Sequence, residues 1–439
     1  MNKAKIFYAQ VDDSWTKQEK LGHLEKLVHI GNVQWQEITP DAKHTWLTEG
    51  LEDEFDTFLK IQDHDLEPKS IFKICSNGVK TNRDRWAYNF SRQDLVENIK
   101  SMIEVYNEQL FKWNQSDKNK KELDNFLIDD DQKISWSEGL KNHILRGTKI
   151  EYEESHVRES QYRLLAQSFL YFDAALNERR YQLPSIFPNS KTEKENQIIG
   201  LAGVGNRKEF GCFASNSIIA LDFAFEKTQC FPFYTYDEDG TNRCENITDW
   251  ALKQFQTHYQ DPKITKWDIF HYTYALLHHP HYRQRYAANL KRELPRIPFA
   301  SEFHPFAISG KRLTEIHINY EQQPEYRLKH IENKDLPIDW RVEKMRLSKD
   351  KTQIKYNDFL TLTGIPPEAF EYKLGNRSAL DWIIDQYQVS TDKRSGITND
   401  PNRLDDEEYI VRLIKQVITV SLETVKIVKG LPDLGLPKD

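Results

Sequence analysis

The sequence predicts a mixed α+β fold, in which a largely antiparallel β region is followed by a mainly helical region. Residues 150–240 contain short, aromatic-rich strand patterns separated by turn sequences such as QLPSIFPNS and YDEDGTN. From Asn246 onward, apolar residues recur at helical spacing and prolines interrupt the pattern. The first forty residues hold two further strand patterns, KAKIFYAQV and VQWQEIT, around a polar helix, an arrangement of Rossmann-like type.

These patterns divide the chain into residues 1–45, 46–245 and 246–439. No glycine-rich turn follows the first strand, so we expect residues 1–45 to be the remnant of a Rossmann-like sheet whose larger part lies elsewhere. Residues 41–60 are acidic and aromatic and are expected to connect this remnant to the β region.

The clearest helix follows the sequence AYNF. Ser91 stands at an N-cap position with Asp94 in the first turn, and apolar residues then recur at helical spacing: Leu95, Ile99, Met102, Ile103 and Tyr106. Residues 115–131 are polar and are predicted to form an exposed connection. The later helical patterns cover residues 246–259, 265–295, 301–321 and 406–430, and residues 341–359 have the pattern of a hairpin.

The composition is that of a folded protein without a membrane anchor. Aromatic residues make up 12% of the chain, a share that disordered chains lack, and the net charge of -7 argues against a polybasic tail. No apolar run reaches the roughly 18 residues of a membrane span. The four cysteines, Cys75, Cys212, Cys230 and Cys244, form no CxxC pair, which favours reduced thiols and a soluble, intracellular protein.

Two motifs offer candidate sites that the surrounding sequence weakens. GLAGVGNRKEF, with Asp222 downstream, resembles a nucleotide-binding glycine loop, but strand and turn patterns follow it instead of a helix. We therefore expect a loop between strands that presents Asn206, Arg207 and Lys208 to phosphates or base edges. IPPE at residues 365–368 lacks the amide and aromatic ends of an adenine methyltransferase box, so its prolines are expected to open a helix.

A histidine cluster and two charge runs are three further candidate sites. His278, His279 and His281 lie near His271 and raise the hypothesis of a metal-dependent hydrolase, against the plainer interpretation of a histidine-rich helix end. The run YAANLKRELPRIPF is expected to be an ordinary solvated helix end. Lys393 and Arg394 lie in a predicted loop, STDKRSGITNDPN, where they contact either phosphate or water.

The strongest candidate is the stretch CSNGVKTNRDRW, which follows a predicted strand. Within nine residues it places amide, hydroxyl and cationic side chains that can pair with base edges and bind phosphates: Asn77, Lys80, Thr81, Asn82, Arg83 and Arg85. Side chains of this kind suit a nucleic acid, a phosphorylated small molecule, or the protein's own turn. In the last case Asn77-Gly78 would form a tight turn and the rest would be ordinary surface.

Several long stretches together resemble one family, the C-terminal specificity region of type ISP restriction-modification enzymes. They are SNGVKTNRDRWAYNFSRQDL, QCFPFYTYDEDG with NITDWALKQF, HYTYALLHHPHYRQRYAANLKRELPRIPF, KTQIKYNDFLTLTGIPPEAFEYKLGNRSALDWIIDQYQV and TDKRSGITNDPN. The resemblance implies one part of a single polypeptide that also carries a nuclease, an ATP-driven translocase, a helical coupler and an adenine-N6 methyltransferase. Residues 1–45 then resemble the closing strands of that methyltransferase.

The departures from the family limit what the resemblance implies. Walker, nuclease, S-adenosylmethionine-loop and NPPY motifs are absent from these 439 residues, so catalysis is not expected of this chain and no cofactor is expected in it. S-adenosylmethionine, ATP and Mg are implied for the full enzyme only. Residues 162–178 replace a segment that we expect to be more basic, which puts a contact there in doubt.

We therefore predict a double-stranded DNA target recognition module of a bacterial, cytoplasmic type ISP-like enzyme, either a cloned fragment or the product of a truncated or split gene. Its expected partners are double-stranded DNA and the methyltransferase and translocase-nuclease parts, on the same polypeptide or a companion. The alternatives are a subunit that docks on a methyltransferase without reading DNA, and a metal-dependent hydrolase that uses the cluster from His271 to His281.

Overall fold

A computed structural model describes residues 4–12, 15–41, 44–63, 69–117, 119–206 and 208–436. The chain divides into two compact units, Met1–Glu52 and Asp53–Asp439. The first unit ends a few residues beyond the predicted boundary at 45, and residues on both sides of position 245 belong to the second unit. The finer division of the second unit stays a prediction.

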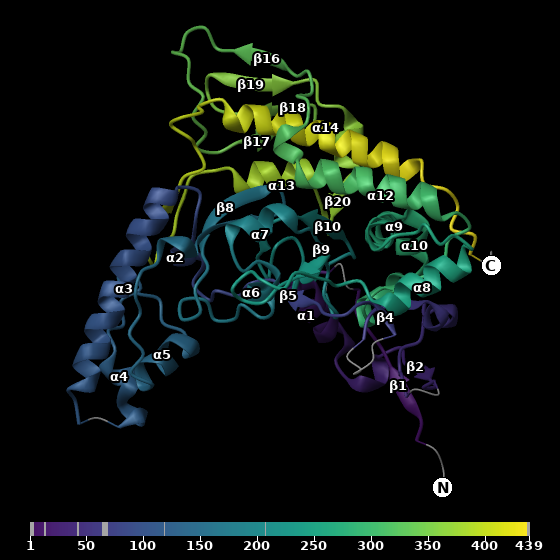
Figure 1. The fold of residues 1–439 in the computed structure, drawn as a ribbon, viewed down its shortest axis with the longest axis horizontal. Helices are drawn as coiled ribbons and strands as arrows, with labels where there is room; N and C mark the ends of the chain where they lie inside the picture. The colour runs from purple at the N-terminus through teal and green to yellow at the C-terminus, as the bar shows by residue number, and fades with distance from the viewer. Residues whose placement is uncertain are drawn as a thin grey trace. The chain divides into compact units, whose positions relative to one another are not determined.

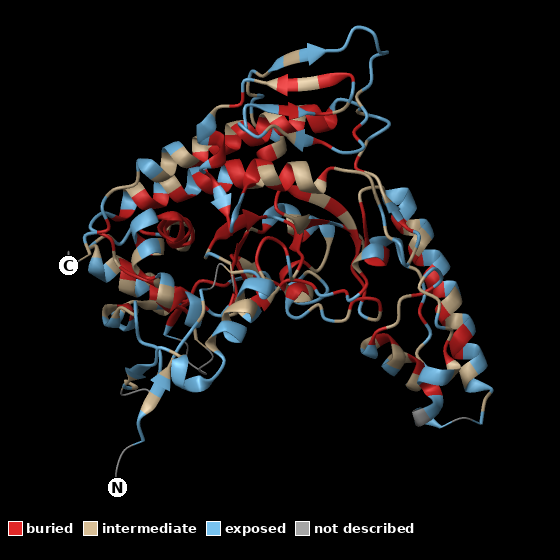
Figure 2. Ribbon diagram, turned by 180° about the vertical axis from the view of Figure 1, so that it is seen from behind, coloured by how far each residue is buried: buried red, intermediate tan, exposed pale blue. Residues whose placement is uncertain are grey.

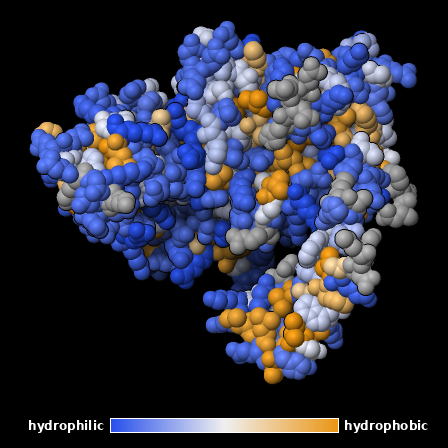
Figure 3. All heavy atoms as spheres, turned by 90° about the horizontal axis from the view of Figure 1, so that it is seen from below, coloured by the Kyte–Doolittle hydropathy of each residue, from blue (hydrophilic) through white to orange (hydrophobic). Residues whose placement is uncertain are grey.

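The N-terminal unit has two short antiparallel strands and one helix, all surface exposed or half-buried. Strand β1 (Ile6–Tyr8) pairs with β2 (Gln36–Ile38), and α1 (Lys17–Leu27) and a 3-10 turn (Ile30–Asn32) connect them. Helix α1 begins at Thr16, whose side chain and that of Glu19 form a reciprocal capping box. None of the described residues in this unit is buried. Figure 3 shows hydrophobic residues, in orange, on its surface.

The second unit contains several small sheets, most of them antiparallel, which confirms the mixed α+β class. The sheet orders are β10-β9-β12-β5, β11-β7-β8-β6, β15-β3-β4 and β16-β19-β18-β17, with three separate hairpins. Pairings β3-β4 and β7-β11 are parallel. The strands are β3 (Leu59–Gln62), β4 (Ser70–Phe72), β5 (Ser76–Asn77), β6 (Tyr88–Asn89), β7 (Val157–Arg163), β8 (Ala166–Tyr171), β9 (Ile198–Leu201), β10 (Cys212–Ser215), β11 (Ile218–Ile219), β12 (Gln229–Pro232), β13 (Tyr234–Thr235), β14 (Cys244–Glu245), β15 (Arg296–Ile297), β16 (Lys329–Glu332), β17 (Arg346–Leu347), β18 (Gln353–Lys355), β19 (Leu360–Thr363), β20 (Lys373–Leu374), β21 (Arg377–Ser378), β22 (Ser390–Thr391) and β23 (Thr398–Asn399).

The helices of this unit lie mainly before residue 150 and after residue 246, as Figure 1 shows. They are α2 (Asp84–Ala87), α3 (Arg92–Asn114), α4 (Leu123–Phe126), α5 (Glu138–Leu145), α6 (Leu183–Ile186), α7 (Ser190–Glu195), α8 (Asp249–His258), α9 (Lys266–His278), α10 (Pro280–Arg285), α11 (Ala287–Arg292), α12 (Phe303–Ile318), α13 (Ala379–Gln386) and α14 (Tyr409–Lys429). Shorter 3-10 turns occur at Asp53–Thr57, Lys120–Glu122, Glu154–His156, Tyr320–Gln322 and Pro367–Phe370. The last of these follows Pro366, so the two prolines do open a helical turn.

Helix α3 confirms the amphipathic pattern that the sequence predicted. The Ser91 hydroxyl accepts a hydrogen bond from the Asp94 amide, and the predicted apolar residues are buried along one side of the helix (Figure 2). They form a separate hydrophobic core with α4 and α5. The connection at residues 115–131 is less exposed than predicted, because Leu123 and Leu127 are buried in this core.

Helix α9 forms the centre of the helical region. Every residue from Ile269 to His278 is buried, which explains why the sequence shows no polar face there. Helix α12 packs directly against it at Gly310, where a β-carbon would lie 1.8 Å from the His271 carbonyl oxygen. A glycine is therefore required at this helix crossing.

Candidate nucleic-acid interface

The stretch CSNGVKTNRDRW begins as an extended strand and not as a tight turn. Asn77 belongs to β5, which pairs with β12, and the next two amides donate hydrogen bonds to Thr228 and Ile219 at 3.0 and 2.9 Å. A β-carbon on Gly78 would lie 2.5 Å from the Ala220 carbonyl oxygen. The glycine is therefore explained by close packing of two backbones, and the Asn77-Gly78 turn considered from the sequence does not form.

Arg83 is buried beneath this loop, so its guanidinium is not available to an external partner. It is 3% exposed and donates hydrogen bonds to the Ser135 carbonyl at 3.1 Å, to the Ser137 hydroxyl at 2.6 Å and to the Leu176 carbonyl. Burial lowers its pKa to about 10, which leaves it charged at neutral pH. The sequence interpretation of Arg83 as a DNA contact is corrected: the residue holds the loop in place.

Thr81 has a similar internal role. It is 2% exposed, its hydroxyl donates to the Asp84 carboxylate, and the same oxygen accepts the Arg83 amide at 3.2 Å. The prediction that Thr81 contacts DNA at the surface is therefore corrected in the same way. Three residues around Thr81 and Arg83 are exposed: Lys80, Asn82 and Arg85. Asn82 adopts a left-handed backbone with φ of 57°, which places it at the tip of the bend.

The structure brings a distant predicted loop to the same place. The Arg85 guanidinium lies 3.5 Å from the Ser390 hydroxyl and 3.9 Å from the Asp392 carboxylate, and Lys393 and Arg394 follow in the β22-β23 turn. Arg394 pairs with Asp131 at 2.5 Å, and both Arg394 and Lys393 are exposed. Asn77 is half-buried at the start of the loop.

Two arginines that the sequence patterns did not single out also lie beside this loop. Arg163 stacks on Tyr162 at 4.0 Å and lies 3.9 Å from Asp84, and the backbone of Arg179 pairs with that of Lys80. Arg163 lies within residues 162–178, the segment expected to be more basic, and Arg179 directly follows it. We give the name loop surface to the exposed Lys80, Asn82, Arg85, Arg179 and Lys393 together with the half-buried Arg163.

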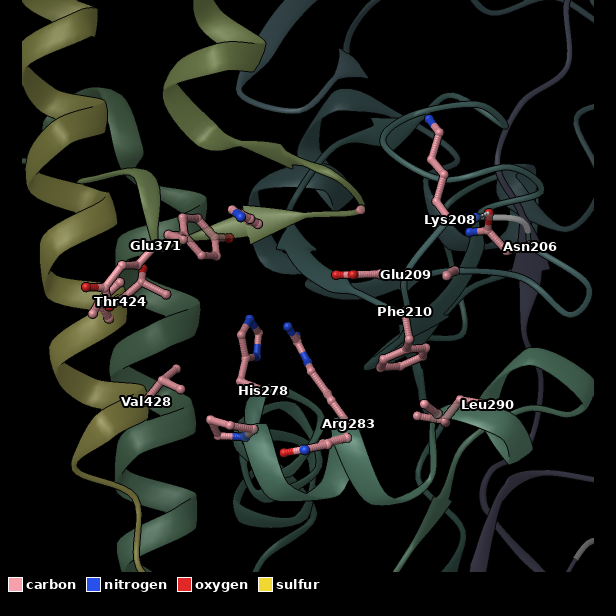
Figure 4. A pocket seen from close by; sticks show the side chains of 18 of the residues that line it. Asn206, Lys208, Glu209, Phe210, His278, Arg283, Leu290, Glu371, Thr424 and Val428 are labelled. Carbon is pink, nitrogen blue, oxygen red and sulfur yellow. Dashed lines mark hydrogen bonds between the residues drawn. The ribbon is translucent and has the colours of Figure 1, made fainter. Parts of the chain in front are cut away.

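The sequence GLAGVGNRKEF, the second predicted contact region, joins β9 to β10. These two strands are antiparallel, which confirms the prediction of a loop between strands in place of a nucleotide-binding turn. Arg207 lies outside the described residues. Asn206 is 7% exposed and accepts the Lys208 amide at 3.0 Å, and the Lys208 ammonium donates to the Ala224 carbonyl at 3.3 Å. Both line a pocket of about 680 Å³ that α10, α11, β20 and α14 complete (Figure 4).

The histidines each interact with a different part of the protein. His278 lies 2.8 Å from the Tyr274 carbonyl, His279 lies 3.1 Å from the Pro432 carbonyl, and His271 stacks on Trp267. Burial lowers the pKa of His271 to about 4 and also lowers that of His278. His281 is exposed. Within the described part of the chain, no three His, Cys, Asp or Glu residues lie close enough to hold a metal ion.

The described helices contain none that is long and apolar enough to cross a membrane. Cationic side chains gathered on neighbouring loops form the kind of local basic surface that can bind nucleic-acid phosphates. Residues 70–414 match the family described as Type ISP C-terminal specificity domain, and the chain belongs to this family. The resemblance noted from the sequence is thereby confirmed.

Solved structures agree with this assignment. The chain is similar to a nuclease-deletion mutant of the Type ISP restriction-modification enzyme LlaGI in complex with a DNA substrate mimic, with 32% identity and a TM-score of 0.87 over 100% of this chain and 40% of that one. It is similar to DrdV in a DrdV-DNA complex, with 36% identity and a TM-score of 0.85 over 98% and 43%. It is also similar to the ATP-dependent Type ISP enzyme LlaBIII bound to DNA, with 28% identity and a TM-score of 0.85 over 96% and 27%.

The chain thus spans less than half the length of each of these proteins. No curated protein matched the sequence.

Proposed function

We propose that this chain is the part of a type ISP-like restriction-modification enzyme that recognises a double-stranded DNA target. The observation that carries the proposal is the similarity over nearly the whole chain to Type ISP enzymes that were solved with DNA or a DNA mimic. In such a module, contacts to phosphates set the register of the protein on the duplex, and side chains in the major groove select the bases.

The loop surface is the proposed contact region. Arg85, Arg163 and Lys393 supply positive charge, and Asn82 supplies an amide at the tip of the bend, where it can pair with an adenine edge. Arg83 supports this surface from below, because it joins the loop to the N-cap of α5 and to the segment ending at Leu176. Asn77, Arg394 and the Asn206–Lys208 loop stay proposed as secondary contacts.

The N-terminal unit is proposed to complete the sheet of an adenine-N6 methyltransferase domain. Its described residues include none that is buried, and several apolar side chains are strongly exposed: Leu24 at 57%, Val28 at 81% and Ile30 at 73%. Apolar side chains grouped on a small unit mark a surface that another part of the protein covers. S-adenosylmethionine, ATP and Mg belong, in this proposal, to the methyltransferase and translocase-nuclease parts, in the bacterial cytoplasm.

The test is binding of the purified chain to a randomised pool of DNA duplexes, followed against salt. We expect an enriched motif that contains adenine, and an affinity that falls steeply as salt rises. Lys80→Ala and Arg85→Ala should each lower the salt slope by about 1 if they contact phosphate. Lys253→Ala is the matched control, because Lys253 is exposed on α8, away from the loop surface.

The exposed apolar residues of the N-terminal unit favour one other function, a subunit that docks on a methyltransferase without reading DNA. This second function predicts weak DNA binding without sequence selection, equal in the unsubstituted chain and in Lys80→Ala, Arg85→Ala and Lys253→Ala. It also predicts a stable complex between the chain and the methyltransferase part.

A further inference from the structure

The pocket beside Asn206 has more cationic groups than its own carboxylates can balance. Its lining includes Lys208, Arg283, Lys291, Lys373 and Lys429, against Glu209 and Glu371. Lys429 pairs with Glu371 at 2.6 Å. The Lys208 ammonium is held at the Ala224 carbonyl, and Figure 4 shows its side chain running along the edge of the pocket and not into it. Among the lining residues, this leaves Arg283, Lys291 and Lys373 with Glu209 as the one other carboxylate.

Arg283 is positioned toward the centre of the pocket. It rises from α10, and its Nε donates to the Leu277 carbonyl at 2.6 Å while one terminal nitrogen lies 3.6 Å from the Cys212 sulfur. Figure 4 shows its guanidinium beside His278, opposite Glu209 and Phe210. A half-buried guanidinium held at its inner edge presents its remaining donors to a ligand in the pocket.

The remaining walls are apolar. Phe210 and Leu290 lie on one side and Val425 and Val428 of α14 on the other. The volume of about 680 Å³ lies within the range of small-molecule sites, roughly 300–1,000 Å³. Inorganic phosphate would leave these walls and Glu209 without a role. A nucleotide satisfies all three features: its phosphate faces the cations, its base covers the apolar wall, and an exocyclic amine can donate to the carboxylate.

We propose that this pocket binds one nucleotide unit, held by Arg283, Lys291 and Lys373 at the phosphate and by Glu209 at an amino-bearing base. The unit can come from a free nucleotide or from a nucleotide of the bound DNA. The site is separate from the loop surface, and the DNA arm of the test rests on the proposed function, whereas the free-nucleotide arm does not.

The experiment uses the full chain with adenosine monophosphate as the free probe, measured by calorimetry, and a DNA duplex from the selected pool as the second probe. The variants are Lys291→Glu and Lys373→Glu, because both side chains are exposed and their exchange leaves the buried framework intact. Lys253→Glu on α8 makes the same charge change elsewhere. Thermal melting confirms that all variants are folded.

A free-nucleotide site predicts binding of adenosine monophosphate that weakens about tenfold in Lys291→Glu and Lys373→Glu and stays unchanged in Lys253→Glu. Uridine monophosphate, which has no exocyclic amine, should bind more weakly, and Glu209→Gln should reduce the difference. A site for a DNA nucleotide predicts no binding of the free probe, but the same pattern of losses with the duplex.

Pocket variants that match Lys253→Glu with both probes would overturn the proposal. If the duplex binds and only the loop-surface variants weaken it, the pocket proposal fails and the proposed function stands. If no duplex binds at all, the proposed function fails, and the adenosine monophosphate result alone decides the pocket.

Discussion

Replacing Arg83 by alanine should destabilise the loop at residues 76–86 by far more than its place in a charged surface sequence suggests. The side chain is 3% exposed and makes three hydrogen bonds, two to carbonyl oxygens and one to the Ser137 hydroxyl. A buried acceptor that loses its donor costs about 1–3 kcal/mol. Two carbonyl oxygens lose their donor, whereas the Ser137 hydroxyl keeps its bond to Glu178 at 2.6 Å, so we expect a loss of about 3 kcal/mol in total.

Hydrogen-deuterium exchange measures this loss locally. A destabilisation of about 3 kcal/mol corresponds to roughly 150-fold faster exchange of the amides between β5 and β6 through local opening. Arg83→Lys keeps the positive charge, but lysine lacks the planar, forked guanidinium that reaches three acceptors. This variant should therefore recover only part of the protection from amide exchange.

Arg85→Ala is the matched control, since the Arg85 side chain is 48% exposed and its nearest carboxylate lies 3.9 Å away. Its effect on exchange should correspond to less than about 0.5 kcal/mol. Equal exchange in Arg83→Ala and Arg85→Ala would refute the assignment of Arg83 as an internal support.

Three other predictions concern packing, pH and thiols. Gly78→Ala should lower stability by about 1–3 kcal/mol in urea unfolding, because its β-carbon would overlap the Ala220 carbonyl, whereas Gly22→Ala meets no atom within 4 Å and should be neutral or mildly stabilising. Burial lowers the pKa of His317 from 6.5 to about 3, so the stability it contributes is complete above pH 6.5 and is lost as pH falls from 6.5 toward 3. His317→Gln should flatten this decline of the unfolding free energy with falling pH, measured by urea titration, whereas the control His281→Gln, at an exposed position, should leave it unchanged. The same pH dependence in His317→Gln and in the unsubstituted protein would contradict the burial argument. A thiol reagent at pH 8 should modify the exposed Cys244 fast and the other three cysteines only on unfolding. The reason is that burial raises the pKa of Cys75 and Cys212 to about 11 and also raises the pKa of Cys230. Fast modification of more than one thiol in the folded protein would contradict this prediction.

The local elements were predictable where short-range patterns control them. The period of apolar residues in α3, together with Ser91 and Asp94, was sufficient to place this helix and its N-cap. The strand patterns on both sides of GLAGVGNRKEF correctly argued against a nucleotide-binding turn. The type ISP family was also evident from the sequence, because its motifs are long and occur in the same order.

The availability of each polar side chain was not predictable in this way. Lys80, Arg83 and Arg85 are chemically similar and lie within six positions, yet Arg83 alone is buried, because carbonyl oxygens from Ser135 and Leu176 converge on that position. The role of Gly78 likewise depends on the carbonyl of Ala220, a residue far along the chain.

The sequence by itself determined the strongly periodic elements such as α3, the family, and the types of side chain available for contact with DNA. The tertiary structure decided which of those side chains reach the surface and which distant ones meet them. Arg85 meets the β22-β23 hairpin, and the loop at Asn206 meets α10 and α14 around one pocket. The physical reason is that propensity and periodicity act over a few residues, whereas burial and charge pairing depend on segments that only the folded chain brings together.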